Sequence, residues 1–291
     1  MSFLASAQGK LKQSDKQGPR ENISGYCGKV LVGDHVEFDK LADGGEAITV
    51  CNANITKVYP RKNVLIRPPI SNIDCLVIMV TKSPSPDFVL VDKLIINCMI
   101  HNIKPILCIS KTDTMTEQEI EQIISGYKNV VDDIVCLSSQ NRKNLEQLTS
   151  IIKNQITALA GQSAVGKSTL LNALLGTNIK TDGLSAKVDR GKHTTRHTEI
   201  FLHGNIRIAD TPGFSLIDLK VDETELRYYY SEFEAFNCKY RGCMHINEDE
   251  GICAVKQAVK TGKINKDRYE RYIKIFQELK KRGLPRTSRS K

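Results

Sequence analysis

Residues 161–168 read GQSAVGKS and match the phosphate-binding pattern GxxxxGK[ST]. They follow an apolar run at 156–159 and open a helical pattern that extends to residue 175. A glycine-rich turn between a strand and a helix points backbone N–H groups at phosphate oxygens. The pattern therefore predicts an α/β domain that binds a nucleotide. The expected nucleotide contacts are Gly161, Gln162, Ser163, Ala164, Val165, Gly166, Lys167, Ser168 and Thr169.

Two further segments fit the phosphate end of such a site. Lys167 is expected to reach the β and γ oxygens, and Ser168 to bind Mg²⁺. A strand at 206–209 ends in Asp210-Thr211-Pro212-Gly213, where Asp210 fits the Mg²⁺ shell and Gly213 the γ-phosphate. The long loop at 177–197 contains GKHTT, and either Thr194 or Thr195 is placed to give Mg²⁺ a second hydroxyl.

Base identity needs a separate reader, because a phosphate loop binds ATP and GTP alike. Ser110-Lys111-Thr112-Asp113 follows a predicted strand, and a carboxylate at Asp113 can accept from both N1–H and the exocyclic amine of guanine. The Lys111 stem can lie along the ring. Ser138-Ser139-Gln140 follows the next strand and resembles the loop that backs the base. Together these segments predict guanine nucleotides.

Strand and helix patterns alternate around these motifs, which indicates a parallel sheet covered on both faces. The predicted strands are 73–80, 106–110, 134–138, 156–159 and 206–209, and the predicted helices are 87–101, 116–125, 144–153 and 166–175. Ligands of such sheets lie at the carboxyl ends of the strands, where the motifs occur.

The segment before this alternation has a different pattern. Short β-like runs at 29–32, 35–38, 47–50 and 55–59 are separated by glycine and asparagine turns. They predict a small all-β barrel over residues 1–69, an OB-fold or an SH3-like barrel, whose first 24 residues form a disordered start or a weak edge strand. The predicted α/β domain covers 70–220, and a third domain covers 221–291.

The third domain combines a metal-ligand pattern with positive charge. Cys238, Cys243, His245 and Cys253 offer three thiolates and one imidazole, the ligand set of a closed structural Zn²⁺ site. The other cysteines of the nine in the chain indicate reduced thiols. Residues 256–291 contain thirteen Lys or Arg and three Asp or Glu, which indicates a polyanionic partner or a solvated basic helix.

Helical patterns at 223–236 and 266–282 flank the predicted zinc site. Each has an aromatic or apolar stripe that we expect to pack: Tyr229, Phe233 and Phe236 on the first, and Tyr269, Ile273, Phe276 and Leu279 on the second. The residues expected to contact the polyanionic partner are the basic residues Lys280, Lys281, Arg282, Arg286 and Arg289. Neither a long apolar run nor a signal peptide is present, so we expect a cytoplasmic protein without membrane contact.

The order of the motifs is unusual, because the base readers at 110–113 and 138–140 precede the phosphate loop at 161–168. In ordinary GTPases the phosphate loop comes first. With this circularly permuted order, the chain resembles the ribosome small subunit-dependent GTPase A family of ribosome biogenesis GTPases. The segments Leu31-Val32-Gly33-Asp34, Pro60-Arg61-Lys62-Asn63 and Arg67-Pro68-Pro69 resemble its barrel and linker, and 191–195 and 238–255 resemble its switch and zinc segments.

The resemblance implies a GTP hydrolase that binds the small (30S) ribosomal subunit and its rRNA, assists late maturation, is stimulated by the subunit and is released after hydrolysis. It also implies Mg²⁺ with GTP, one structural Zn²⁺ per chain and, we expect, a monomer. Two positions depart from ordinary GTPases. Ser110 replaces an asparagine, which is expected to remove one side-chain bridge to the phosphate loop, and Phe214 replaces the water-orienting glutamine, so intrinsic hydrolysis should be slow. His193 is the candidate catalytic residue beside Lys167.

Two other classes of function fit parts of the pattern. A P-loop ATP- or GTP-dependent small-molecule enzyme, such as a kinase or a ligase, would leave the basic tail incidental and show no guanine preference. A nucleic-acid-binding protein with a purely structural nucleotide site would not need Lys167, Ser168 and Asp210. The guanine-specific Asp113 is the residue that discriminates the first alternative.

Overall fold

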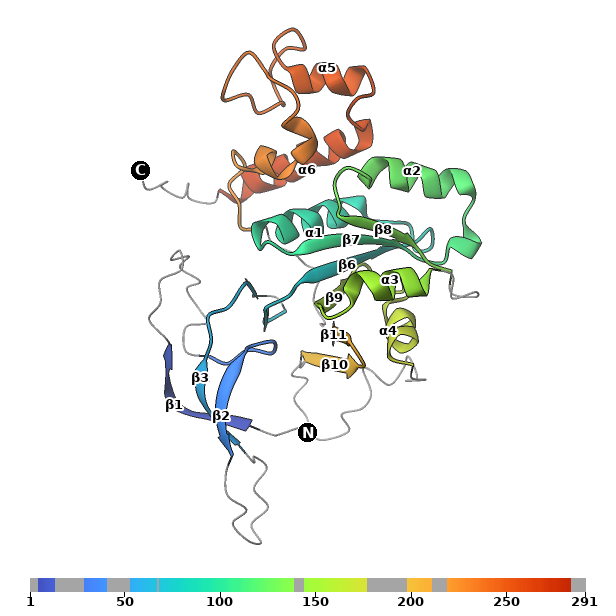
Figure 1. Ribbon diagram of the computed structural model, residues 1–291. Coiled ribbons are helices and arrows are strands. Elements are labelled where there is room, and N and C mark those ends of the chain that lie inside the picture. Colours follow the sequence, from blue (N-terminus) through green and yellow to red (C-terminus); the bar gives the residue numbers. More distant parts are fainter. Residues whose placement is uncertain are drawn as a thin grey trace.

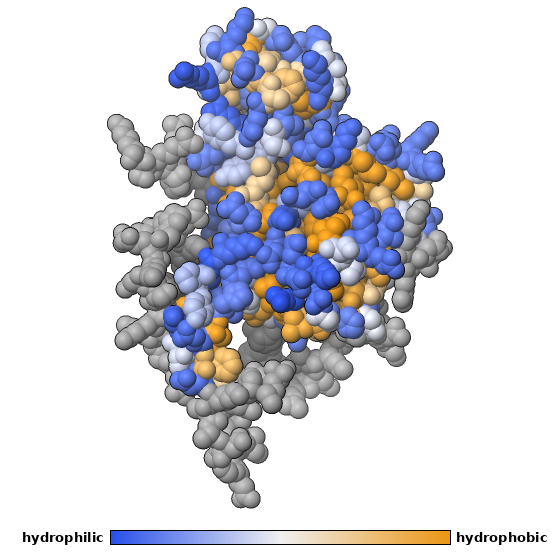
Figure 2. All heavy atoms as spheres, viewed as in Figure 1, coloured by the Kyte–Doolittle hydropathy of each residue, from blue (hydrophilic) through white to orange (hydrophobic). Residues whose placement is uncertain are grey.

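The computed structural model describes residues 5–13, 29–40, 53–66, 68–138, 144–176, 198–210 and 219–283. The chain forms a small N-terminal sheet, a central α/β layer and a C-terminal module of helices and loops on the opposite side of that layer (Figure 1). On the face shown in Figure 2, hydrophobic residues gather over the α/β layer, and hydrophilic residues cover much of the remaining surface.

A six-stranded sheet organises the central layer. Its spatial order is β10-β11-β9-β6-β7-β8, and every pair is parallel except β10 with β11. The strands are β6 (Cys75–Val80), β7 (Lys104–Ile109), β8 (Asp133–Cys136), β9 (Ile156–Ala160), β10 (Glu199–His203) and β11 (Ile206–Asp210). The parallel sheet predicted from the alternating pattern is confirmed, and β10 is a strand that the pattern did not indicate.

Helices cover both faces of this sheet, as expected for buried parallel strands. They are α1 (Phe88–Ile100), α2 (Glu117–Tyr127), α3 (Leu145–Ile152) and α4 (Lys167–Leu175). One apolar core lies between the sheet and helices α1 and α2, and a second lies between the sheet and helices α3 and α4. Local capping explains two of the helix starts. Asp87 accepts from Leu90 N, and Thr116 and Glu119 form a reciprocal capping box.

The N-terminal part contains a three-stranded sheet, β1 (Ala5–Gln13), β3 (Ala53–Val58) and β2 (Val36–Lys40), in the spatial order β1-β3-β2. A hairpin of β4 (Val64–Leu65) and β5 (Ile70–Ser71) leads into the central layer. This arrangement is consistent with the predicted OB-like barrel. The strand predicted at 29–32 is wrong: only Val32 forms a bridge, to Ile70. The strand predicted at 47–50 lies outside the described residues.

The C-terminal module is built on α6 (Lys266–Arg282) with the short helix α5 (Ala254–Lys260). The helix predicted at 223–236 is wrong, because two 3₁₀ turns, η2 (Leu226–Tyr229) and η3 (Ser231–Phe233), replace it. A 3₁₀ turn brings residues i and i+3 into line. Tyr230 and Phe233 therefore stack with ring centroids 5.2 Å apart, and Tyr230 meets Tyr272 of α6 edge-on at 5.0 Å.

The packing role predicted for the aromatic residues of this module is confirmed, with one change on α6. The residues of α6 that are buried are Arg268, Tyr272, Ile275 and Leu279, whereas Tyr269, Ile273 and Phe276 lie at the edge of the module core. None of the helices in the described ranges combines the length and the apolar character that crossing a membrane requires.

Candidate functional site

The phosphate loop connects β9, in the middle of the sheet, to the start of α4. Gly161 has a φ of +136°, and a Cβ there would lie 2.5 Å from the carbonyl oxygen of Met79 on β6. Only glycine allows this approach of loop and strand. The Lys167 Nζ donates to the carbonyl oxygens of Gly161, at 2.8 Å, and Gln162, at 2.5 Å. Lys167 therefore lies against the phosphate loop that precedes α4. Ser168 and Thr169 lie in the first turn of this helix.

Two residues at the carboxyl end of β7 hold this loop from the side. The Ser110 hydroxyl donates to the carbonyl oxygen of Val165 at 2.7 Å and lies 3.1 Å from that of Val80. The Lys111 Nζ donates to the carbonyl oxygen of Ala164 at 2.9 Å. The expectation that a serine at 110 removes the side-chain bridge to the phosphate loop is therefore wrong, because the shorter side chain reaches a backbone carbonyl directly.

The two expected base-reading segments also meet. The Ser138 hydroxyl, after β8, donates to Oδ1 of Asp113 at 2.9 Å, and Thr112 N donates to Leu137 O at 3.1 Å. Asp113 lies in the 3₁₀ turn η1 (Thr112–Thr114) that follows β7. A hydroxyl on one carboxylate oxygen holds the orientation of Asp113, and the exposed carboxylate can still accept hydrogen bonds from a guanine edge.

A third loop, which the sequence did not single out, also contacts this region. The loop from β6 to α1 approaches the base-reading side, where Lys111 Nζ lies 3.3 Å from the Ser83 carbonyl oxygen. It also approaches the phosphate loop, where the Gln162 side chain accepts from Asp87 N at 2.9 Å. Neither contact has a sequence signature, because both use backbone atoms. The only local signal is the run Ser83-Pro84-Ser85-Pro86-Asp87, which marks a turn before a helix cap.

For the other predicted site residues, the structure gives either the position in the sheet alone or no description. Asp210 is the last residue of β11, which pairs with β9 beside the phosphate loop. Several predicted residues lie outside the described part of the chain: Ser139, Gln140, His193, Thr194, Thr195, Gly213, Phe214, Arg286 and Arg289.

The predicted zinc ligands come together in the C-terminal module. One ligand atom from each of Cys238, Cys243, His245 and Cys253 lies within 4.8 Å of all the others. The Cys238 and Cys253 sulfurs are 3.9 Å apart, and His245 Nδ1 lies 3.6 Å from the first and 3.4 Å from the second. Four ligands placed tetrahedrally at the usual Zn–S distance have edges of about 3.8 Å. The cluster is therefore compatible with zinc.

The chemistry of the donor set fits a metal as well. Burial lowers the pKa of His245 to about 4, so its imidazole is neutral at physiological pH and can donate a lone pair. Burial raises the pKa of Cys243 to about 12 and raises that of Cys253. Buried thiolates therefore need a neighbouring cation, which a divalent metal supplies.

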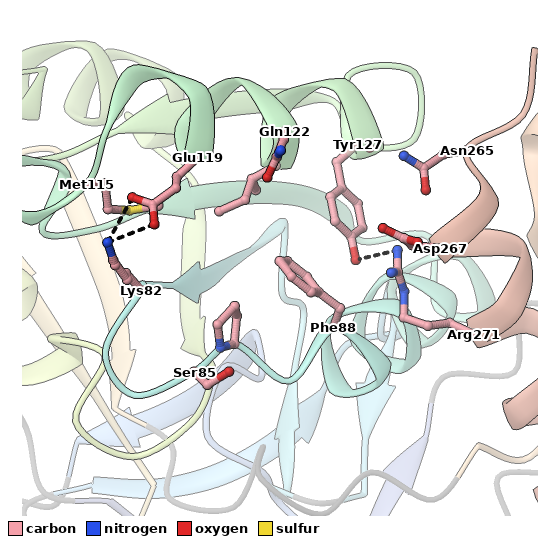
Figure 3. A pocket seen from close by; sticks show the side chains of 13 residues that line it. Lys82, Ser85, Phe88, Met115, Glu119, Gln122, Tyr127, Asn265, Asp267 and Arg271 are labelled. Carbon is pink, nitrogen blue, oxygen red and sulfur yellow. Dashed lines mark hydrogen bonds and ion pairs between the residues drawn. The ribbon is translucent and has the colours of Figure 1, made fainter. Parts of the chain in front are cut away.

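A cavity of about 330 Å³ lies apart from both clusters, between the β6–α1 loop, α2 and the start of α6. Figure 3 shows Phe88 and Tyr127 facing into it, with the Lys82–Glu119 ion pair at one end and Arg271 beside Tyr127 at the other. None of the predicted nucleotide or zinc residues lines it.

Comparisons with known proteins agree with this geometry. Residues 58–220 match the RsgA GTPase family. The chain is 41% identical over 261 residues to the small ribosomal subunit biogenesis GTPase RsgA of Geobacillus sp. (strain WCH70), which covers 87% of this chain and 86% of the relative. It is 38% identical over 234 residues to the protein of the same name from Caldanaerobacter subterraneus subsp. tengcongensis, with 78% of each chain covered.

Two solved structures are similar over nearly the whole chain. YjeQ from Thermotoga maritima superposes with a TM-score of 0.74 and 28% identity, covering 95% of this chain and 90% of that one. YloQ, described as a circularly permuted GTPase, superposes with a TM-score of 0.71 and 31% identity, covering 95% and 88%. The description of YloQ agrees with the permuted motif order of this chain.

Proposed function

Because this chain belongs to the RsgA GTPase family and is a GTP hydrolase, we propose that it assists the late maturation of the small ribosomal subunit. Subunit binding stimulates its turnover, and hydrolysis to GDP releases it. The observation that supports the GTP-binding part of the proposal is the convergence of the phosphate loop with the base-reading loops, through Ser110–Val165 and Lys111–Ala164. The names of the relatives, small ribosomal subunit biogenesis GTPase, support the choice of partner.

Within this site we assign roles to residues as follows. Asp113, oriented by Ser138, reads guanine, and Lys111 covers the base. The loop 161–168 and Lys167 hold the phosphates. Ser168 and Asp210, with Thr194 or Thr195, are the Mg²⁺ ligands, and the ion neutralises charge on the phosphates when it is bound. Ser139 and Gln140 complete the base pocket, and Gly213 contacts the γ-phosphate.

The C-terminal cluster has a structural role in this proposal. Cys238, Cys243, His245 and Cys253 hold one Zn²⁺ per chain, and four protein ligands leave no position for a substrate. The proposal also includes the oligomeric state, the location and the RNA contacts of the protein. The protein acts as a monomer in the cytoplasm and contacts ribosomal RNA through its N-terminal barrel and its basic C-terminal residues.

The most direct test compares GTP hydrolysis with and without isolated small subunits. We expect a large increase in turnover on adding the small subunit and none on adding the large subunit. Equal rates in all three conditions would refute the proposed partner, even though hydrolysis itself would still be observed. A small-molecule kinase or ligase, by contrast, would respond to a low-molecular-weight acceptor and not to either subunit.

Base selectivity tests the role of Asp113. Asp113→Asn should lower the affinity for guanosine nucleotides by about tenfold or more and raise that for xanthosine nucleotides, because xanthine has a carbonyl where guanine has an amine. Competition binding with both nucleotides measures the exchange of preference. The control is Asp133→Asn, since Asp133 begins β8 and is exposed. Unchanged guanosine affinity in Asp113→Asn would contradict the assignment.

The catalytic role of His193 is tested in single-turnover hydrolysis with saturating small subunits. His193→Ala should leave GTP affinity nearly intact, because the proposed role of the imidazole is to orient the attacking water and not to bind the nucleotide, and should slow stimulated hydrolysis by about 100-fold. Lys167→Ala should instead weaken nucleotide binding itself. An unaltered rate in His193→Ala would mean that another group orients the water.

A further inference from the structure

The phosphate loop contains a backbone conformation that one of its residues disfavours. Three residues of the loop 161–168 have positive φ: Gly161 at +136°, Gly166 at +99° and Ala164 at +63°. Glycine adopts such angles readily, whereas the Cβ of another residue comes too close to the following carbonyl oxygen. Ala164 therefore holds a left-handed conformation for which the loop uses glycine at the other two positions.

Non-glycine residues with positive φ are concentrated at the functional sites of this protein. Seven of them occur in the described part of the chain, and four are asparagines, which tolerate this conformation better than most residues. The other three are Lys111, Ala164 and His245. Lys111 and Ala164 belong to the nucleotide site, and His245 belongs to the metal cluster. Strained backbone of this kind clusters at ligand sites, where the surrounding contacts impose it.

Ala164 differs from the other two strained residues in what its side chain supplies. The Lys111 ammonium and the His245 imidazole are functional groups that glycine could not provide. The Ala164 methyl group has neither a donor nor an acceptor. It is exposed and belongs to neither apolar core of the central layer. Since neither chemistry nor packing accounts for this methyl group, its effect on the loop is the backbone strain itself.

Contacts of the loop with the end of β7 impose the conformation of Ala164. The Ala164 carbonyl oxygen accepts from Lys111 Nζ at 2.9 Å. The next carbonyl oxygen, that of Val165, accepts from the Ser110 hydroxyl at 2.7 Å. A left-handed residue in a loop turns successive N–H groups to one side, which is the arrangement that binds phosphate oxygens. Bound phosphates therefore favour the strained loop, and their departure allows it to relax.

We propose that Ala164 shortens the dwell time of the bound nucleotide, so that GDP leaves sooner after hydrolysis than it would from a loop with glycine at this position. The strain opposes the phosphate-bound conformation and is relieved on release. Relaxation at Ala164 also loosens its bond to Lys111, the residue that covers the base. The proposal rests on the proposed function, because it takes 161–168 as the phosphate site and GDP as the product.

The first test measures the release of GDP that carries a fluorescent N-methylanthraniloyl group. The complex is mixed with excess unlabelled GDP in a stopped-flow fluorimeter. Ala164→Gly should slow release about fivefold, because it removes the strain of one left-handed residue. Ala164→Val should hasten release, because a β-branched residue is least compatible with positive φ. A merely structural role of Ala164 would change the melting temperature and leave the release rate as it is.

A further variant separates relief of strain from added flexibility, since glycine brings both. Asparagine tolerates positive φ without the wide conformational freedom of glycine. Ala164→Asn should therefore also slow the release of labelled GDP, by a smaller factor than Ala164→Gly. If Ala164→Gly hastened release, loop flexibility would govern the dwell time, and the proposal would be overturned.

Asn102 provides the matched control. It has a φ of +52°, is exposed, and precedes β7 at the end of the strand away from Ser110. Asn102→Gly makes the same kind of backbone change outside the nucleotide site, so the release rate of labelled GDP should not change. Melting temperatures are measured on every variant, because added glycine also raises the entropy of the unfolded chain.

The outcomes separate this proposal from the proposed function. Small-subunit stimulation of the unmodified protein tests the proposed function alone, whereas the release rates are measured without any subunit. Equal release rates in the unmodified protein and Ala164→Gly would overturn the role of Ala164. Equal slowing in Asn102→Gly would also overturn it, because the effect would then not depend on the phosphate loop.

Discussion

At the scale of single residues, the Ser110 hydroxyl replaces a longer side chain by bonding to backbone. It donates to Val165 O at 2.7 Å in a buried position, which links the base-reading strand to the phosphate loop. Ser110→Ala leaves that carbonyl without the bond, and a lost hydrogen bond of this kind costs about 1 kcal/mol. We expect GDP affinity to fall about fivefold, measured by titration calorimetry. Ser125→Ala, which removes an exposed hydroxyl bonded to Gln122 O, should leave it unchanged.

Gly161 carries the second prediction at this scale. Its φ of +136° and the 2.5 Å approach of a Cβ to Met79 O mean that Gly161→Ala must displace the loop from β6. We expect nucleotide binding to become undetectable while circular dichroism remains that of the folded protein. Gly204→Ala is the matched control, because Gly204 also has positive φ (+56°) but nothing within 4 Å of its Cβ position. Equal effects of the two changes would show that backbone strain, and not the close approach, decides the outcome.

At the scale of elements, α1 and α6 are joined by a buried cluster of charges. Asp92 on α1 is fully buried and accepts from Arg268 and Arg271 of α6, each at 2.6 Å, and from the Tyr127 hydroxyl at 2.8 Å. Removing one partner of a buried ion pair typically costs about 3–5 kcal/mol, because the other charge remains desolvated. Asp92→Ala should therefore lower the free energy of unfolding by about that amount in urea titrations.

The control for this prediction is Glu278→Ala, which breaks the more exposed pair with Lys93 between the same two helices. Exposed pairs contribute about 0–1 kcal/mol, so a small loss is expected. If Asp92→Ala were equally mild, the cluster would not be what joins the helices.

At the scale of the whole molecule, the C-terminal module shares its core with the central layer. Ile96 of α1 is fully buried in the same cluster as Tyr272 and Ile275 of α6. Loss of the metal site should therefore open the loops around the ligands and leave α6 docked on α1. We expect Cys243→Ala, or chelation, to speed hydrogen exchange in 237–253 but much less in α6, with GTP affinity unchanged. Loss of protection across α6 would mean that the module folds only around its metal.

The sequence by itself determined the local features of this protein. The phosphate loop, the alternating strands and helices and the four metal ligands depend on residues that are near one another in the chain, so composition and spacing predicted them. The permuted motif order was also evident from the sequence, because each motif is a short local pattern. The fold tolerates this order, since a strand in the middle of the sheet can keep the same neighbouring strands whichever motif comes first in the chain. Asp87 and Thr116 likewise cap their helices through residues three positions away.

The tertiary structure alone decided what depends on distant pairs. Residues 223–236 have a helical pattern, but in the folded protein they form 3₁₀ turns. In these turns Tyr230 and Phe233 pack on Tyr272, which is distant in the sequence. The Asp92–Arg268 and Asp92–Arg271 pairs join residues 176 and 179 positions apart, a separation at which no local pattern signals a partner. The contact of Ser110 with Val165 O uses a backbone atom that has no identity in a sequence. Local patterns depend on short stretches of chain, whereas the burial of a side chain depends on residues that become its neighbours only in the folded protein.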